Sequence, residues 1–258
     1  MGKRISKYLD KKSLRIYKVN DSRLKEVIKV KLKTLVKYLT YLINCSLSIV
    51  FPEGSFCLLC KEERLQGYFL CHECKNKIKL NREAFYIEIK EMKLVYYSTA
   101  YYSHEIRELL MRFKYKRDFN VARFFASNIM KVIDYNKIDF DIICYVPASK
   151  DGKKIRGYDQ SEILACIIKE QSGMPVVKCL KRDINTREQK TVRVEDRWEN
   201  LKSTFKFDIR YLKEVKNKKI ILIDDVVTTG STLYFCYKEL KNNGAKEINI
   251  LTVAKSRL

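Results

Sequence analysis

IILIDDVVTTGST, residues 220 to 232, is the stretch of this chain that decides the fold. Its four apolar residues 220–223 predict a buried parallel strand, whose carboxyl end presents Asp224 and Asp225 at a crevice of the sheet. The loop that follows offers backbone N–H groups and hydroxyls at the positive end of a helix, and Gly230 permits a positive φ. Such a loop suits a phosphate monoester. The alternative is that the two aspartates merely cap a helix.

The two adjacent carboxylates narrow the class of ligand. Asp224 and Asp225 repel phosphate, so their natural partners are ribose hydroxyls or a Mg²⁺ ion held through intervening water. The pair therefore favours a sugar phosphate over a free anion. This stretch resembles the 5-phosphoribosyl-1-pyrophosphate (PRPP) motif of the type I phosphoribosyltransferase family. The resemblance implies that Asp224 and Asp225 contact the ribose hydroxyls. It implies that the 5-phosphate is held by Thr228, Thr229, Gly230, Ser231 and Thr232.

Length and charge set broad limits on the protein. A chain of 258 residues with 46% hydrophobic residues can bury a substantial core, which predicts one main domain with smaller attachments rather than a disordered tail. The formal charge of +22 favours an anionic partner such as nucleic acid, anionic lipid or a phosphorylated ligand. A codon bias toward lysine would also raise the charge, so local clustering is the better guide.

Residues 1–50 hold the strongest cluster of charge, with thirteen Lys and Arg against three acids, an excess of 13 − 3 = +10. Residues 24–42 predict a basic amphipathic helix. Its apolar positions are Leu24, Val27, Ile28, Leu32, Leu35, Val36, Leu39 and Leu42. Interspersed lysines and polar residues argue against a membrane-spanning helix, and no cleavage site for a signal peptide follows. The helix either packs on its own protein or contacts a membrane surface or nucleic acid.

Four cysteines predict a zinc site. Cys57 and Cys60 form one C-x2-C pair and, after ten residues, Cys71 and Cys74 form another, which is the pattern of a structural zinc site with four thiolates and no open position for water. A redox pair is the alternative. His72 is expected to point outward. The other cysteines are single and indicate a reducing cytoplasm rather than a disulfide framework: Cys45, Cys144, Cys166, Cys179 and Cys236.

A second basic cluster lies in the middle of the chain. We expect a charged connector at residues 80–92, a strand at 93–102 and helical structure at 105–125. Basic and aromatic side chains alternate near the end of that helical region, which suits single-stranded nucleic acid. The candidate residues are Arg112, Lys114, Tyr115, Lys116 and Arg117. The alternative is a tyrosine-rich core with a solvated basic rim.

Residues 139–147 predict another buried strand, followed by the polar loop ASKDGKKIRGYDQSE and a helix over 161–171. This basic loop, with Gly152 and Gly157 for backbone freedom, suits a pyrophosphate. The candidate pyrophosphate-binding residues are Lys150, Lys153, Lys154, Arg156 and Gly157. The long polar segment 181–201 predicts a mobile flap that closes over a bound ligand, and surface disorder is the alternative.

Taken together, the four cysteines, the loop IRGYDQSEILA, the flap residues and the closing IDDVVTTGSTL resemble the ComF family over residues 50–258. The flap residues of this resemblance are Arg182, Thr186, Gln189, Arg197 and Asn200. ComF proteins join a zinc ribbon to a phosphoribosyltransferase-like domain and are linked to DNA uptake in bacterial competence. The family often has Asn where this chain has Asp159, and its lead-in is usually shorter and less basic than residues 1–50.

The predicted architecture is a type I phosphoribosyltransferase-like α/β fold, with a basic segment at 1–52, a zinc ribbon and connector at 53–92 and the main domain at 93–258. The resemblance implies PRPP with Mg²⁺ as ligand, single-stranded DNA and DNA-uptake proteins as partners, and a cytoplasmic location, with peripheral contact at the inner membrane face. In a working transferase, Asp224 and Asp225 would stabilise the cationic sugar of the transition state. No segment of the sequence predicts an acceptor pocket, so both a DNA-uptake protein and an active transferase remain as hypotheses.

Overall fold

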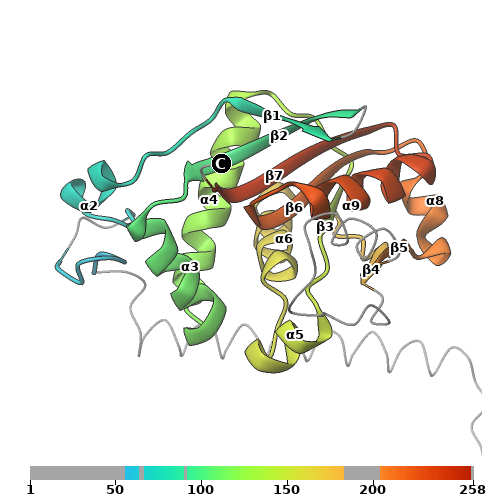
Figure 1. Cartoon of the computed structure of the whole chain (residues 1–258). Helices are drawn as coiled ribbons and strands as arrows, with labels where there is room; N and C mark the ends of the chain where they lie inside the picture. The colour runs from blue at the N-terminus through green and yellow to red at the C-terminus, as the bar shows by residue number, and fades with distance from the viewer. Residues whose placement is uncertain (1–55, 64–66, 90–91, 183–203, 257–258) are drawn as a thin grey trace, which may run out of the picture. The chain divides into compact units, whose positions relative to one another are not determined.

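The computed structural model describes residues 56–63, 67–89, 92–182 and 204–256 (Figure 1). The chain divides between residues 53 and 54, and everything described belongs to the second unit. The predicted amphipathic helix at 24–42 lies outside the described residues. So do four of the predicted flap residues, Thr186, Gln189, Arg197 and Asn200. Within the described residues, no helix is long and apolar enough to cross a membrane.

A five-stranded sheet forms the centre of the described unit, in the order β1-β2-β7-β6-β3. All neighbouring strands are parallel except β1 and β2, which form an antiparallel pair at one edge. Strands with continuous apolar runs, such as β3 and β6, are buried on both faces, as parallel strands generally are. The strands are β1 Ala84–Ile89, β2 Met92–Tyr101, β3 Ile142–Tyr145, β6 Lys219–Val227 and β7 Glu247–Lys255.

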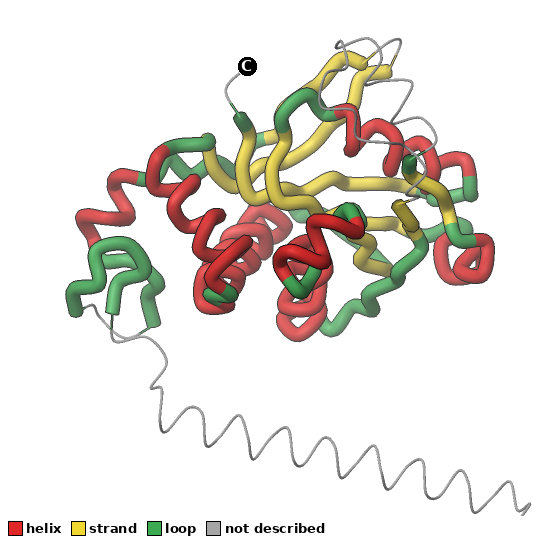
Figure 2. Tube along the Cα trace, turned by 60° about the horizontal axis from the view of Figure 1, so that its bottom comes forward, coloured by secondary structure: helices red, strands yellow, loops and turns green. Residues whose placement is uncertain are grey.

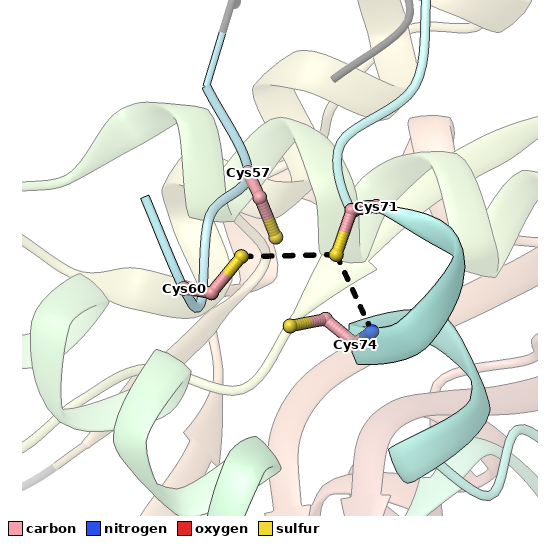
Figure 3. Close-up of side chains that lie close together, drawn as sticks. All are labelled: Cys57, Cys60, Cys71 and Cys74. Carbon is pink, nitrogen blue, oxygen red and sulfur yellow. Dashed lines mark hydrogen bonds between the residues drawn. The ribbon is translucent and has the colours of Figure 1, made fainter. Parts of the chain in front are cut away.

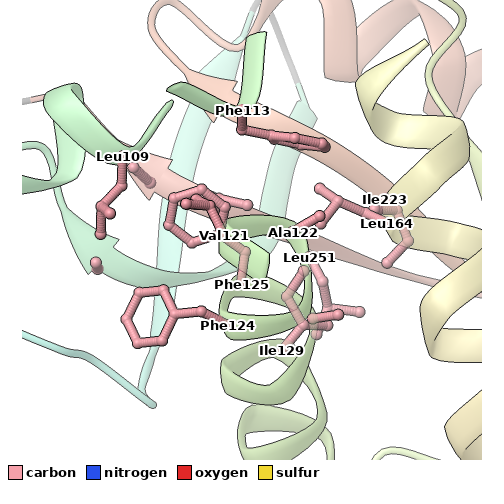
Figure 4. Packing of buried hydrophobic residues seen from close by; sticks show 14 of the residues in the cluster. Leu109, Phe113, Val121, Ala122, Phe124, Phe125, Ile129, Leu164, Ile223 and Leu251 are labelled. Carbon is pink, nitrogen blue, oxygen red and sulfur yellow. The ribbon is translucent and has the colours of Figure 1, made fainter. Parts of the chain in front are cut away.

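Helices cover both faces of this sheet (Figure 2). On one face, α4 and α6 pack against alternate residues of the strands, including Ile223 and Leu251 (Figure 4). On the other face, α9 packs against Ile220, Leu222 and Ile250. This period of two follows from the pleat of the strands. The helices are α2 His72–Lys77, α3 His104–Lys116, α4 Phe119–Tyr135, α5 Lys150–Arg156, α6 Gln160–Ser172, the 3-10 turn η1 Ile209–Tyr211, α8 Leu212–Val215 and α9 Ser231–Asn242. The α/β class predicted from the sequence is confirmed.

Several element boundaries differ from the predictions. The supposed connector at 80–92 contains β1, which pairs with β2 and stacks Phe85 on Tyr96 with ring centroids 5.5 Å apart. The predicted helical run 105–125 is two helices, because Arg117 adopts a left-handed conformation with φ 54° and Asp118 caps α4. The expected strand at 93–102 is present as β2. The prediction of a polar loop after β3 is wrong in part, because this segment holds the short helix α5 between Ser149 and Gly157.

A second, two-stranded sheet marks the base of the predicted flap. Its strands are β4 Leu180–Arg182 and β5 Phe205–Phe207, which pair antiparallel on either side of residues 183–203. The Arg182 guanidinium lies 5.5 Å from the centroid of the Phe205 ring. Beside this pair, the Asp208 carboxylate binds Lys181 at 2.7 Å and Arg210 at 2.6 Å, which ties the base of the segment to η1.

The cysteine-rich segment packs into the main core. Cys57, Leu70, Cys74 and Ile78 belong to the same hydrophobic cluster as residues of α3 and α4. The Phe69 ring meets the Phe124 ring edge-on, with centroids 5.8 Å apart. The fold of the cysteine knuckles and the stability of the main domain are therefore coupled.

Candidate functional site

The predicted phosphate loop joins β6 to α9 at the carboxyl edge of the sheet. Gly230 is buried and has φ 75°, and a Cβ placed there would lie 2.7 Å from Cδ1 of Ile87 in β1, so only glycine fits. The helix begins at Ser231, and no side chain in the described part of the chain caps its first turn. Thr229 and Ser231 share a hydroxyl hydrogen bond of 2.9 Å. The N–H groups at this helix end carry partial positive charge and suit an anion.

Asp224 lies in the last part of β6 itself rather than in the loop after it. Its Oδ1 accepts hydrogen bonds from Ser161 Oγ at 3.1 Å and from the Asp225 backbone N–H at 2.9 Å. Burial and the neighbouring charge of Asp225 raise the pKa of Asp224 to about 8, although these donors and Lys114 act in the opposite direction. A carboxyl group with such a pKa exchanges its proton near neutral pH, a property common at functional sites.

Asp225 is paired with a lysine from a distant helix. Lys114 Nζ, near the end of α3, lies 2.5 Å from Asp225 Oδ2, and both side chains are mostly buried. The other carboxylate oxygen, Oδ1, accepts the Val226 N–H at 2.6 Å. Lys114 was predicted as a nucleic-acid contact, and the structure instead places its charge at the carboxylate pair.

The predicted nucleic-acid cluster is divided by the fold. Arg112 is only 8% exposed, and its guanidinium donates to the Asp118 carboxylate and to the Leu58 carbonyl. These contacts hold the cysteine knuckle to the helix pair and leave Arg112 little accessible surface, and its contact with nucleic acid stays a prediction. Tyr115, Lys116 and Arg117 are exposed at the end of α3, and their contact with nucleic acid stays a prediction.

The candidate pyrophosphate residues gather on α5, between β3 and α6. Lys150 and Lys154 are exposed, whereas Lys153 Nζ pairs with Asp159 Oδ2 at 3.0 Å. Asp159 is 3% exposed and caps α6. Gly157 ends α5 with φ 81°. The Nε atom of Arg156 and the Nε2 atom of Gln160 are buried without a hydrogen-bond partner among the described residues. Unsatisfied donors near the carboxyl edge of β3 suit an anionic ligand.

The four predicted metal ligands converge. The sulfur atoms of Cys57, Cys60, Cys71 and Cys74 all lie within 4.8 Å of one another, with Cys60 and Cys71 3.7 Å apart (Figure 3). Four sulfurs at zinc–sulfur distances of about 2.3 Å in a tetrahedron are about 3.8 Å apart, so the geometry fits a metal site. His72 is exposed and is not among the four converging ligands.

Backbone N–H groups also donate hydrogen bonds to sulfur atoms of the cysteine pairs. Sulfur atoms accept N–H groups, from Leu59 to Cys57 and from Cys74 to Cys71, each at 3.4 Å. Burial raises the pKa of Cys57, but backbone donors at Cys71, Cys60 and Leu59 outweigh it and lower that pKa to about 6. These donors favour a thiolate at Cys57, whereas burial and the neighbouring cysteines raise the pKa of Cys74 to about 12.

Comparison with known proteins agrees with this geometry. A model of the phosphoribosyl transferase domain matches residues 174–257. Competence protein ComFC of Bacillus subtilis (strain 168) is 26% identical over 83% of this chain and 83% of its own length. Competence protein F of Haemophilus influenzae (strain ATCC 51907 / DSM 11121 / KW20 / Rd) is 24% identical over 83% of this chain and 96% of its own. The chain is therefore similar to these two competence proteins over most of its length.

Solved structures give a weaker likeness. Adenine phosphoribosyltransferase from Thermoanaerobacter pseudethanolicus ATCC 33223 is 13% identical, covering 71% of this chain and 98% of that chain, with a TM-score of 0.37. A score this low supports no further argument. The fold assignment depends instead on the family model, on the parallel sheet with helices on both faces and on the cysteine cluster.

Two residues at the carboxylate pair Asp224–Asp225 were not predicted from the sequence. Ser161 stands in the second position of α6 and reaches Asp224 from a segment 63 residues earlier. Lys114 comes from α3, in a cluster whose composition pointed to nucleic acid. The IRGYDQSEILA motif contains Ser161, but nothing in its spacing indicates which hydroxyl faces β6.

Proposed function

We propose that this protein binds PRPP with Mg²⁺ at the carboxyl edge of β6 and takes part in DNA uptake during natural transformation. The observation that carries the proposal is the carboxylate pair Asp224–Asp225 beside the uncapped start of α9. This arrangement joins a site for ribose hydroxyls to a site for a phosphate monoester, as a sugar phosphate requires.

Each part of PRPP has a chemically suitable partner. The 5-phosphate accepts hydrogen bonds from N–H groups in the first turn of α9 and from the hydroxyls of Thr228, Thr229, Ser231 and Thr232. Asp224 and Asp225 accept hydrogen bonds from the ribose hydroxyls. The cations of α5, Lys150, Lys153, Lys154 and Arg156, attract the pyrophosphate. Lys114 adds a further positive charge beside Asp225, at 2.5 Å from its carboxylate.

The donor set also suits the two metals implied by the family. Carboxylate oxygens of Asp224 and Asp225 are hard ligands of the kind Mg²⁺ prefers, and the ion itself would neutralise pyrophosphate oxygens. The four thiolates of the cysteine knuckles suit Zn²⁺ and leave no open coordination position, so the zinc is structural. Cys57 and Cys74 also pack in the main core. Removal of the zinc ion by a chelator should therefore lower the melting temperature of the whole described unit.

A binding experiment tests the PRPP site directly. We expect calorimetric titration of the zinc-loaded chain with PRPP and Mg²⁺ to give saturable binding, and Asp225→Asn to weaken it at least tenfold. Asp141→Asn is the matched control, because Asp141 is an exposed aspartate at the start of β3, at the opposite end of the parallel strands. Equal binding by the Asp225 and Asp141 variants would contradict the site.

An active transferase is the second candidate, favoured by the raised pKa of Asp224. A carboxyl group that titrates near pH 8 beside a second carboxylate is suited to proton transfer or to a cationic transition state. Released pyrophosphate, measured with candidate bases and amines as acceptors, tests this activity. Release that depends on both an acceptor and Asp224 would establish turnover, and binding without release would favour a sensor of PRPP.

The cellular role is inferred from the competence proteins of Bacillus subtilis and Haemophilus influenzae. We place the protein in the cytoplasm, acting on incoming single-stranded DNA with uptake proteins at the inner face of the membrane. Deletion of its gene in a naturally transformable host should reduce transformation without affecting growth. Complementation by the wild type but not by Asp225→Asn would link the PRPP site to that role.

A further inference from the structure

A pocket of about 130 Å³ lies between the second cysteine knuckle and α4, apart from the carboxylate pair. One wall is the chain from Gly67 to Leu80, and the other is a single face of α4. Its apolar surfaces come from side chains such as Phe69 and Phe124, whose rings are in edge-on contact. The lining residues are Gly67, Tyr68, Phe69, Leu70, Lys75, Ile78, Leu80, Phe124, Ser127, Asn128 and Lys131.

Positive charge concentrates at the rim of this pocket. Lys75 and Lys131 both line it, from opposite walls. Burial lowers the pKa of Lys131, and the charges of Lys75 and Arg82 lower it further. Three cations that repel one another are stabilised by an anion placed among them, so the rim is complementary to negative charge.

Aromatic rings accompany these cations. Tyr68 lines the pocket with 58% of its surface exposed. Tyr135, on the same side of α4, is 59% exposed and lies under the Arg82 guanidinium at 5.6 Å from its ring centroid. Lys131 and Tyr135 are four residues apart, a rise of about 6 Å along the helix. That step is comparable to the spacing of neighbouring bases in an extended single strand.

We call the pocket together with Lys75, Lys131, Arg82 and Tyr135 beside it the groove. We propose that this groove binds single-stranded DNA, with one base in the pocket against Tyr68 and the flanking phosphates on Lys75, Lys131 and Arg82. The inference rests on the DNA-handling role proposed above and gives it a surface. An apolar slot suits the face of an unpaired base, while the hydroxyl of Ser127 supplies a polar group beside it. A duplex keeps its bases stacked inside and cannot fill the slot.

The cations of the groove differ from those near the end of α3 in what they contact. Of the five residues first considered for nucleic acid, Arg112 is committed to Asp118 and Leu58, and Lys114 to Asp225. The cations at the pocket are instead paired with aromatic surface and a cavity. Tyr68 stands three residues before Cys71, one of the four cysteines that converge.

The test is the anisotropy of a labelled oligothymidylate with the full zinc-loaded chain, over a salt series. We expect Lys75→Gln with Lys131→Gln to weaken binding at least tenfold. The slope of log K against log salt should fall by about 1.4, since each phosphate contact on a single strand contributes about 0.7. Tyr68→Leu should weaken binding about tenfold without changing that slope. The matched control is Lys213→Gln with Lys238→Gln, which removes two exposed lysines from α8 and α9.

Three outcomes would overturn the assignment. Equal weakening in both lysine pairs would mean that only net charge matters. Wild-type affinity in the groove variants would exclude the groove while leaving DNA binding elsewhere on the protein. Failure of the wild type to bind any single strand would remove both the groove and the DNA part of the proposed function. Zinc content and PRPP binding of each variant, expected to be unchanged, show that the fold and the carboxylate site are intact.

Discussion

The two strand–helix connections at the carboxyl edge of the sheet look alike in sequence and differ in how their helices begin. After β3, the carboxylate of Asp159 accepts the Ala148 N–H at 2.9 Å, faces the Glu162 N–H at 3.5 Å and pairs with Lys153. After β6, α9 begins behind Gly230 without a side-chain cap among the described residues. A capped helix end is already satisfied, whereas a glycine-capped end keeps its N–H groups for a ligand.

The aspartates of the two connections also differ in the groups that surround them. Asp159 is surrounded by donors and a lysine, and contributes to the local fold. At Asp224, burial and then the charge of the neighbouring Asp225 carboxylate raise the pKa. Crowded like charges lower the stability of the folded chain, so their presence is more easily explained by binding than by folding. Loss of the Asp159 carboxylate is therefore expected to lower stability, and loss of the Asp224 carboxylate to lower ligand affinity.

Glycine substitutions give the largest expected contrast. Both Gly230 and Gly157 have positive φ, but a Cβ at Gly230 meets the half-buried Ile87 side chain at 2.7 Å, whereas at Gly157 it meets the flexible Arg117 guanidinium. We expect Gly230→Ala to lower the free energy of unfolding by about 2–4 kcal/mol and Gly157→Ala by about 1–2 kcal/mol. Urea denaturation of both variants measures the difference. Equal losses would mean that the contact with Ile87 relaxes freely.

Replacement of Asp224 should stabilise the chain at high pH. The pKa of Asp224 rises from 3.8 to about 8 on folding, so the folded state keeps a proton that the unfolded chain releases above pH 3.8. Its contribution to the free energy of unfolding therefore declines between these two pH values. Asp224→Asn should be more stable than the wild type by about 1–3 kcal/mol at pH 8, allowing for partial solvent screening.

The pH dependence separates this mechanism from a general effect of the amide. Below the ordinary pKa of aspartate both chains are neutral at this position, and the stability difference should disappear. Urea denaturation at pH 3 and pH 8 measures it. A difference of the same size at both pH values would contradict the raised pKa. Binding of PRPP by this variant should fall despite its higher stability.

Asp159 provides the reverse case at the other connection. Asp159→Ala removes the cap of α6, the bond from Ala148 and the partner of Lys153, and should lower the free energy of unfolding by about 1–2 kcal/mol. Asp159→Asn keeps the acceptor oxygen and should cost less than the alanine variant. Thermal denaturation ranks the three chains, and PRPP affinity should change less than twofold in the asparagine variant. A large loss of affinity there would give Asp159 a ligand contact.

The sequence predicted what local pattern determines. Apolar runs predicted β3 and β6, and the spacing of Cys57, Cys60, Cys71 and Cys74 predicted their convergence. Contacts between distant segments were not predictable. The strand β1 depends on pairing with β2, and the partner of Asp225 comes from a helix 111 positions earlier. The lysines of residues 112–117 look equivalent in sequence, yet only the helix geometry decides which of them reaches the sheet.

Lys114 offers the finest distinction within that cluster. Removing its charge from beside Asp225 should weaken binding of the polyanionic PRPP about fivefold, because Lys114 Nζ lies at the centre of the site. It should also raise the pKa of Asp224 further, since Lys114 acts to lower it. Lys114→Gln tests both, by calorimetric titration and by NMR titration of the aspartate carboxyl groups. Lys116→Gln, two positions along and exposed, is the control that should change neither. Weaker PRPP binding in both variants would reduce Lys114 to a contributor of net charge, whereas a change in Lys114→Gln alone would make the α3 lysine part of the site.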